Sequence, residues 1–181
     1  MAGGGDDTGR AALAIAREAV ERYVRTGLVA EPPPDVPPDL RTRSGAFVTL
    51  RACGRLRGCI GTLLPSRPDI GREIVACAVA AATRDPRFPP VRGPELVELD
   101  YEVDLVGPLE RVASPADLDP KCYGVLVEAA EQRGVLLPDL EGVEDAEHQV
   151  RIARTKAGLP ASAVVTLYRF QVRRFRDGHR P

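Results

Sequence analysis

The amino-acid sequence predicts an α+β fold with a mostly antiparallel sheet flanked by helices. Three observations support this prediction. Two pairs of short strands have the pattern of hairpins, three amphipathic helices occur singly before or between strands, and no glycine-rich phosphate-binding loop follows a strand. Hairpins mixed with single helices are typical of α+β proteins, whereas a doubly wound parallel sheet needs regular alternation of strands and helices.

Apolar residues that recur every three or four positions predict the helices. The first has Asp7 or Thr8 as its N-cap, and the second has Asp69. The third ends in a stretch where Gly158 suits the left-handed position that follows many helices. Together the patterns predict helices over residues 10–25, 69–84 and 144–157.

Short runs of alternating or β-branched residues predict the strands. Between the first two, Cys53-Gly54 suits a tight two-residue hairpin turn. The strand that starts at Val97 alternates apolar residues with four carboxylates, so it has one apolar and one acidic face. The predicted strands cover residues 46–52, 55–60, 97–106, 123–127, 134–137 and 164–175.

The length of 181 residues suits one domain, which we expect to cover residues 8–181. Prolines dominate residues 31–39, and because proline fixes φ and lacks a backbone donor, this segment is expected to be an extended surface connector. The formal net charge is −1, so no overall field favours nucleic acid or an anionic membrane.

Other features of the sequence indicate the cell compartment and whether a metal or cofactor is expected. The sequence has no apolar run of membrane-spanning length, and its start lacks the pattern of a signal peptide, so we expect a cytoplasmic protein with reduced thiols. Cysteines without paired metal-ligand spacing and only two histidines, His148 and His179, predict no metal site and no cofactor. Glu144 and His148 are one turn apart on the third helix, which is too few ligands for a metal.

The segment Leu56-Arg-Gly-Cys-Ile-Gly61 is the first candidate site. In a regular strand Arg57 and Cys59 share a face, and a cation beside a thiol lowers its pKa. Cys59 is therefore a candidate catalytic nucleophile or ligand contact, with Arg57 as the anion-binding group. Gly58 and Gly61 leave room for a ligand or for another backbone. The alternative is an inert core cysteine between two packing glycines.

A rigid loop, Arg84-Asp-Pro-Arg-Phe-Pro-Pro90, is the second candidate. Asp85 and Arg87 are expected to bind substrate beside the Cys59 strand, because loops on rigid scaffolds often carry binding groups. The structural alternative is an Asx turn at Asp85, with Phe88 packed into the core.

Two charged segments could also carry function. The acidic strand face (Glu98, Asp100, Glu102, Asp104) could hold a hard cation, be solvated, or pair with arginines such as Arg51 and Arg57 on neighbouring strands. The C-terminal segment from Arg169 to Pro181 carries five arginines and interleaved aromatic residues, a pattern that nucleic-acid platforms share. Because the whole chain is not basic, we expect a solvated strand that balances the acidic one.

These motifs, in this order and spacing, resemble those of the AMMECR family, whose prokaryotic members are called AmmeMemoRadiSam system protein A. The resemblance extends from about Arg10 to Phe175. It rests on Gly45-Ala-Phe-Val-Thr-Leu50, Leu56-Arg-Gly-Cys-Ile-Gly61, Asp85-Pro-Arg-Phe-Pro-Pro-Val91, Glu95-Leu96, Tyr101-Glu-Val103, Gly134-Val-Leu-Leu-Pro138 and Lys156-Ala-Gly-Leu-Pro160.

The resemblance implies a larger and a smaller lobe, with a cleft lined by the Cys59 segment. It also implies association with a Memo-like protein and a radical SAM protein. The chain has no CxxxCxxC motif and so cannot itself hold the radical SAM cluster. The resemblance names no reaction and leaves open whether the chain is an enzyme.

Three hypotheses follow. The first is a component of this system that binds a small anionic or peptide substrate in the Cys59 and Arg57 cleft. The second is a non-catalytic adaptor, and the third binds nucleic acid through the C-terminal arginines.

Overall fold

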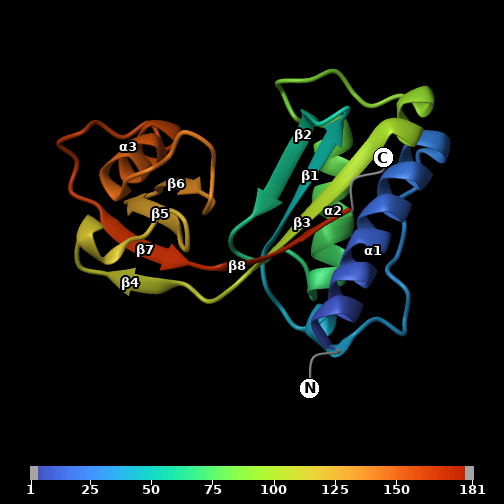
Figure 1. Ribbon diagram of the computed structural model, residues 1–181, viewed down its shortest axis with the longest axis horizontal. Helices are drawn as coiled ribbons and strands as arrows, with labels where there is room; N and C mark the ends of the chain where they lie inside the picture. Colours follow the sequence, from blue (N-terminus) through green and yellow to red (C-terminus); the bar gives the residue numbers. More distant parts are fainter. Residues whose placement is uncertain (1–3, 178–181) are drawn as a thin grey trace. The chain divides into compact units, whose positions relative to one another are not determined.

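The computed structural model describes residues 4–177, with side chains from residue 7 onward (Figure 1). His179 and Arg180, considered above, lie outside these residues. The chain divides into two compact units: unit 1 runs to Leu105 and resumes at Arg173, and unit 2 is residues 106–172. These units correspond to the larger and smaller lobes that the resemblance implied.

Unit 1 is a four-stranded sheet with two long helices. The strand order is β2-β1-β3-β8, and β1 pairs with β2 and β3 in antiparallel register. Two short 3-10 helices, η1 and η2, precede β1 and β3. The elements are α1 (Gly4–Thr26), η1 (Pro38–Arg41), β1 (Ala46–Ala52), β2 (Arg55–Thr62), α2 (Ile70–Thr83), η2 (Gly93–Glu98), β3 (Leu99–Val106) and β8 (Val172–Arg176).

Unit 2 is a smaller sheet packed against one helix. Its strand order is β4-β7-β5-β6, with antiparallel pairs β4–β7, β5–β6 and β5–β7. The prediction of α+β with antiparallel pairing is thus confirmed, although the described strands form two sheets. The elements are β4 (Glu110–Val112), η3 (Pro115–Asp117), β5 (Gly124–Ala129), β6 (Gln132–Leu136), α3 (Ala146–Lys156) and β7 (Thr166–Phe170).

The helices follow the predicted periodicity, with corrections at two ends. Asp69 caps α2 as predicted, accepting a hydrogen bond from the backbone N of Arg72 at 2.8 Å. α1 begins at Gly4, so Asp7 and Thr8 lie inside the helix and do not cap it. α3 begins after Asp145, which caps it, so Glu144 precedes the helix. Glu144 and His148 are therefore not one turn apart on a helix.

Two predicted strands change at their ends. Residues 97–98 belong to η2, and Val97 is 72% exposed, because the strand begins only at Leu99. The predicted strand over residues 164–175 divides at Gln171 into β7 and β8, which belong to different sheets. The short strand β4, absent from the prediction, pairs with β7.

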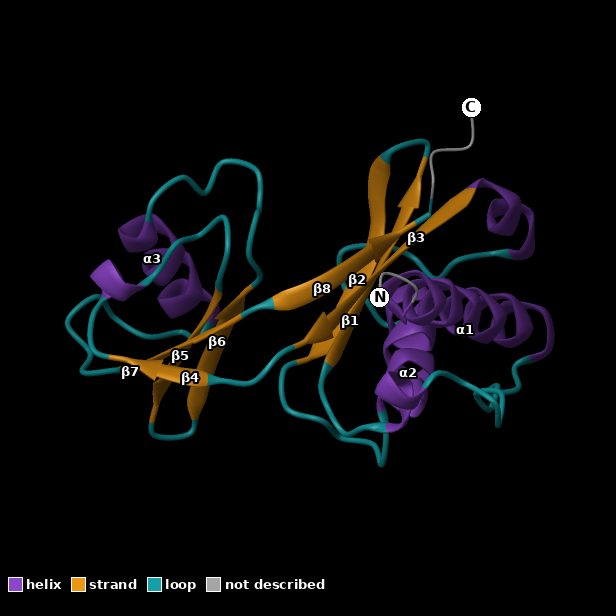
Figure 2. Cartoon of the chain, turned by 60° about the horizontal axis from the view of Figure 1, so that its bottom comes forward, coloured by secondary structure: helices purple, strands orange, loops and turns teal. Residues whose placement is uncertain are grey.

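The two faces of the unit 1 sheet differ in chemistry. Val48, Leu50 and Val103 are fully buried on the face that α1 and α2 cover (Figure 2). Alternate residues point to the opposite face. That second face carries Thr49 on β1 and the carboxylates of Glu102 and Asp104 on β3, and the candidate site lies there.

Candidate functional site

A β-bulge at Arg57 sets the face on which Cys59 lies. The turn at Cys53-Gly54, where φ is 50° and 75°, begins the register with Ala52 opposite Arg55. The register then shifts by one, so that Gly58 lies opposite Leu50 and Cys59 opposite Thr49. Without this extra residue Cys59 would lie opposite Val48, on the face covered by helices.

The same bulge separates Arg57 from Cys59. Leu56 lies opposite Arg51, whose side chain shares a face with Thr49 and therefore with Cys59. The expectation that Arg57 and Cys59 share a face is wrong, because the bulge interrupts the alternation between them. Arg57 instead forms a bidentate ion pair with Glu95 of η2, at 2.9 and 3.0 Å. This pair lowers the pKa of Glu95.

The thiol of Cys59 is partly buried and accepts a hydrogen bond from the Thr49 hydroxyl at 3.2 Å. Burial raises its pKa above the ordinary value, and the nearby carboxylates of Asp104 and Asp85 act in the same direction. The Thr49 hydroxyl and the Arg87 guanidinium lower it by less. The expected low-pKa thiolate is therefore wrong, since loss of hydration outweighs the Thr49 hydroxyl and the Arg87 guanidinium.

Asp85 and Arg87 hold the backbone of Cys59 at the free edge of β2. The buried Asp85 carboxylate accepts a hydrogen bond from the Cys59 N–H at 2.8 Å. It also accepts from the Arg87 backbone N, Nε and Nη2, at 3.1, 2.9 and 2.7 Å. Arg87 Nη2 in turn donates to the Cys59 carbonyl at 3.4 Å. The predicted Asx turn is present, and these side chains occupy backbone groups that another strand would otherwise pair with.

This arrangement also fixes the charge of the loop. The Arg87 side chain and the backbone N–H groups of Cys59 and Arg87 hold the pKa of Asp85 well below its usual range. Asp85 is therefore ionised at neutral pH, and it compensates the guanidinium beside it. Arg87 is still 55% exposed, so part of its guanidinium faces solvent next to the Cys59 strand.

Other residues of unit 1 occupy the space beside Gly58 and Gly61. A Cβ at Gly58 would lie 2.2 Å from the Ala81 carbonyl of α2, so this glycine lets the helix backbone approach the sheet. A Cβ at Gly61 would lie 2.1 Å from the Phe47 ring. The predicted close approach of another backbone is confirmed at Gly58. Substrate contact by either glycine stays a prediction.

The acidic strand pairs with the C-terminal strand. Arg174 of β8 donates to Asp104 at 2.7 and 3.1 Å, and Arg176 pairs with Glu102. The predicted partners Arg51 and Arg57 do not supply these pairs. The reason is that β8, not predicted as a separate strand, lies beside β3. Arg169 and Arg173 likewise pair with Glu110 and Asp39, at 2.9 and 2.6 Å.

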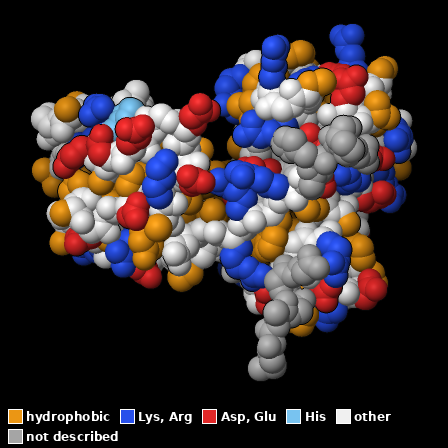
Figure 3. Space-filling model, viewed as in Figure 1, with side chains coloured by type: hydrophobic (Ala, Val, Ile, Leu, Met, Phe, Trp, Pro, Cys, Tyr) orange, Lys and Arg blue, Asp and Glu red, His pale blue; other side chains and the backbone are white. Residues whose placement is uncertain are grey.

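The charges of the C-terminal strand are thus largely balanced. On the face that Figure 3 shows, basic side chains lie among acidic ones. Within the described part of the chain, no three His, Cys, Asp or Glu side chains are arranged to hold a metal ion. No helix there has the length and apolarity to cross a membrane.

Three residues of the site were not predicted as site residues from the sequence. Thr49 could be found only by knowing the bulge, since regular pairing would place Val48 opposite Cys59. Glu95 had a signal, because it belongs to a motif of the resemblance, but nothing in the sequence tied it to Arg57. Arg174 was noticed as part of a basic segment, although its pairing with Asp104 depends on strand order.

Comparison with known proteins places this geometry in a family. The AMMECR1 family model matches residues 13–175. A protein from Thermotoga maritima is 51% identical over 87% of this chain and 92% of its own length. A protein from Methanothermobacter thermautotrophicus is 40% identical over 94% and 95%. In a Clostridium acetobutylicum protein, 41% identical, the match covers 90% of this chain but 35% of that protein.

A solved structure agrees with the fold. The crystal structure of an uncharacterised protein from Pyrococcus horikoshii matches with a TM-score of 0.87 and 33% identity, over 94% of this chain and 91% of that one. The family match covers every residue discussed around Cys59. From the family model and these relatives together, we conclude that the chain belongs to the AMMECR1 family.

Proposed function

We propose that this chain is the ligand-binding A component of a system that also contains a Memo-like protein and a radical SAM protein. The association rests on the family resemblance. The site that we assign to a small anionic or peptide substrate is the sheet face at Cys59. A cytoplasmic location is part of the proposal, and the four cysteines, all free, support a reducing compartment.

One observation carries the choice of site: a half-exposed cation and a partly buried thiol flank the same stretch of backbone. Arg87 donates a hydrogen bond to the Cys59 carbonyl. Asp85 accepts hydrogen bonds from the Cys59 N–H and from the Arg87 guanidinium, and so holds both residues in place. Both arginines are ion-paired, but the Arg87 side chain is 55% exposed and that of Arg57 only 15%, so Arg87 replaces Arg57 as the anion-binding group. Asp85 and Arg87 hold this stretch of backbone by hydrogen bonds, and such preorganisation reduces the entropy lost on binding.

The raised pKa of Cys59 argues for a neutral thiol that contacts the ligand, not for a nucleophile. A thiol acts as a nucleophile mainly as its thiolate, and burial disfavours that form here. Cys59 would then contribute shape and a weak hydrogen bond, while Arg87 contributes charge. Peptide binding by strand addition at this position is disfavoured, because Asp85 and Arg87 already cap the backbone of β2.

The adaptor hypothesis is the second candidate, and one observation favours it. Most groups around Cys59 have structural partners: Asp85 binds backbone, Arg57 binds Glu95, and Gly58 accommodates α2. A site of this kind can present a rigid surface to partner proteins without contacting substrate. The ion pairs of the C-terminal arginines, in contrast, offer no support for nucleic-acid binding.

Co-expression with a Memo-like and radical SAM pair tests the proposal. We expect the small-molecule or peptide profile of the cells to change only when this chain is present. Arg87→Gln should abolish the change, and Cys59→Ser should weaken it. Arg55→Gln, an exposed arginine of the same hairpin, is the matched control and should behave as wild type.

The outcomes separate the two candidates. If Arg87→Gln and Cys59→Ser folded and retained the full change in profile, the ligand-binding proposal would be wrong and the adaptor hypothesis favoured. Circular dichroism of each purified variant establishes that it is folded. No change in profile with the wild-type chain would remove the system association itself.

A further inference from the structure

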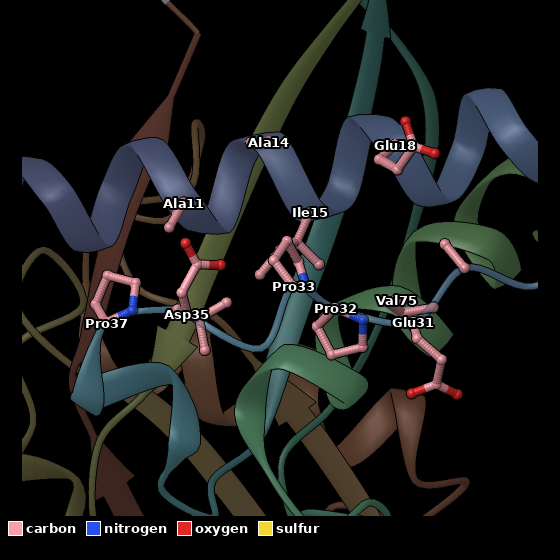
Figure 4. Close-up of a pocket in the computed structure, with 12 residues that line it drawn as sticks. Ala11, Ala14, Ile15, Glu18, Glu31, Pro32, Pro33, Asp35, Pro37 and Val75 are labelled. Carbon is pink, nitrogen blue, oxygen red and sulfur yellow. The ribbon is translucent and has the colours of Figure 1, made fainter.

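A separate cavity lies between α1 and the proline-rich connector of residues 31–39 (Figure 4). Its volume is about 410 Å³, within the range of roughly 300–1,000 Å³ usual for small-molecule sites. None of its lining residues surrounds Cys59. Its apolar lining consists of Ala11, Ala14, Ile15, Ala30, Pro32, Pro33, Val36, Pro37 and Val75.

The walls of this cavity are stiff. On α1 the lining residues recur at helical spacing and form one stripe that faces the connector. The connector is held by its prolines and by Arg41, whose guanidinium donates to the carbonyls of Val36 and Pro34, at 3.1 and 3.2 Å. Leu40, just beyond it, is fully buried. The cavity is therefore formed before any ligand binds.

The charged residues that line the cavity are all acidic: Glu18, Glu31 and Asp35. Glu31 pairs with Arg72 at 3.3 Å, and Figure 4 shows its carboxylate directed away from α1. Asp35 turns its carboxylate toward α1 beside Ala11, while Glu18 lies toward the other end of the cavity. Among the described residues, Glu18 and Asp35 have no ion-pair partner.

We propose that this cavity binds a small organic cation, namely a primary amine carried on an aliphatic or aromatic body. The apolar lining accommodates the hydrocarbon, the carboxylate of Asp35 attracts the ammonium group, and Glu18 adds a second negative charge at the other end of the cavity. An anion of the same shape would be repelled by both carboxylates. The two charges thus select the sign of the ligand, and the prolines and alanines select its bulk.

Three probes of similar size test the proposal on the full chain: phenethylamine, phenethyl alcohol and phenylacetate. Binding is followed by amide chemical shifts in a nitrogen-15 NMR spectrum. We expect phenethylamine to shift resonances of α1 and residues 30–37, phenethyl alcohol to bind more weakly, and phenylacetate not to bind there. Equal binding of all three probes, or shifts located elsewhere, would contradict the proposal.

Two variants and a control sharpen the test. Asp35→Asn should weaken phenethylamine binding about fivefold, as expected for a partly exposed charge pair. Ala14→Leu should prevent binding, because Ala14 is exposed on α1 and a leucine there fills the cavity without entering the core. Glu147→Gln, an exposed carboxylate of α3, should bind as wild type. Wild-type affinity in either Asp35→Asn or Ala14→Leu would show the proposal to be wrong.

Discussion

In each unit a glycine of the sheet lets a helix backbone approach closely, but the two units bury different kinds of polar side chain. In unit 1 Gly58 admits the Ala81 carbonyl of α2, and in unit 2 Gly134 admits the Ala153 carbonyl of α3. Aliphatic side chains dominate both cores, and unit 1 also buries Tyr101. Among the described residues, however, all four buried carboxylates belong to unit 1, and the buried polar residue of unit 2 is Gln149.

This difference indicates where the molecule is specialised. Burying a carboxylate costs free energy unless hydrogen bonds or cations compensate it. Glu73, Asp85, Glu102 and Asp104 each have such partners, and Glu73 and Asp85 both hold segments next to β2. Unit 1 therefore fixes the surroundings of β2 by polar contacts, where unit 2 depends on apolar packing. The candidate site lies within the polar arrangement.

The largest expected effect comes from removing one of these carboxylates. Glu73 is fully buried and accepts hydrogen bonds from Thr62, Ser66 and Arg67, at 2.7 to 2.9 Å. Glu73→Ala should lower the free energy of unfolding of unit 1 by about 3 kcal/mol, because these donors lose their acceptor. Urea denaturation combined with amide hydrogen exchange resolved by unit measures the change.

A carboxylate of unit 2 supplies the control. Glu128 forms an ion pair with Arg133, whose side chain is 55% exposed. Glu128→Ala should cost about 0.5 kcal/mol or less, since such pairs are largely solvated. Comparable losses in the two variants would remove the distinction between the units.

Low pH should destabilise unit 1 more than unit 2. The folded-state pKa values of Asp85, Glu73 and Glu95 are lowered, so the stability they contribute is present above their unfolded values of about 4 and is lost as pH falls below them. Asp104, whose pKa is raised by burial, opposes this trend. Amide exchange between about pH 6 and pH 2 should show unit 1 losing more protection.

A variant isolates one carboxylate of this group. Asp85→Asn cannot ionise at residue 85, so the acid loss of unit 1 should be smaller than in the wild type. In unit 2 the lowered pKa is that of Asp119, an exposed residue bonded to the backbone of Lys121. Equal acid losses in the two units, or an unchanged slope in Asp85→Asn, would contradict the assignment.

Local patterns were enough to predict most elements of the fold. The cap at Asp69 and the turn at Cys53-Gly54 each depend on neighbouring residues, and both are confirmed. The division of the last strand at Gln171 is different. It depends on which sheet each half joins, and alternation along one strand contains no such information.

The candidate site was harder to predict because one extra residue, at the bulge in β2, decides which side chains lie beside Cys59. The sequence indicated that Cys59, Asp85 and Arg87 come together, and they do. The bulge at Arg57 shifts the register by one, which turns Arg57 away and brings Thr49 to the thiol. A bulge is stabilised by packing around it, and no local pattern of residues marks its position.

The smallest expected effect concerns the thiols. Cys53 and Cys122 are exposed, Cys59 is partly buried with a raised pKa, and burial raises the pKa of Cys77 to about 12. Alkylation by iodoacetamide at about pH 8, followed by peptide mass spectrometry, should label Cys53 before Cys59 and Cys77 last, because only the thiolate reacts rapidly.

Thr49→Val removes the hydroxyl that lowers the pKa of Cys59, so the labelling of Cys59 should be slower than in the wild type. Cys53, in the same hairpin, is the internal reference and should keep its rate. Faster labelling of Cys59 in Thr49→Val would mean that the hydroxyl shields the thiol from the reagent and does not lower its pKa. That result would contradict the account of the Cys59 pKa on which its role as a neutral ligand contact rests.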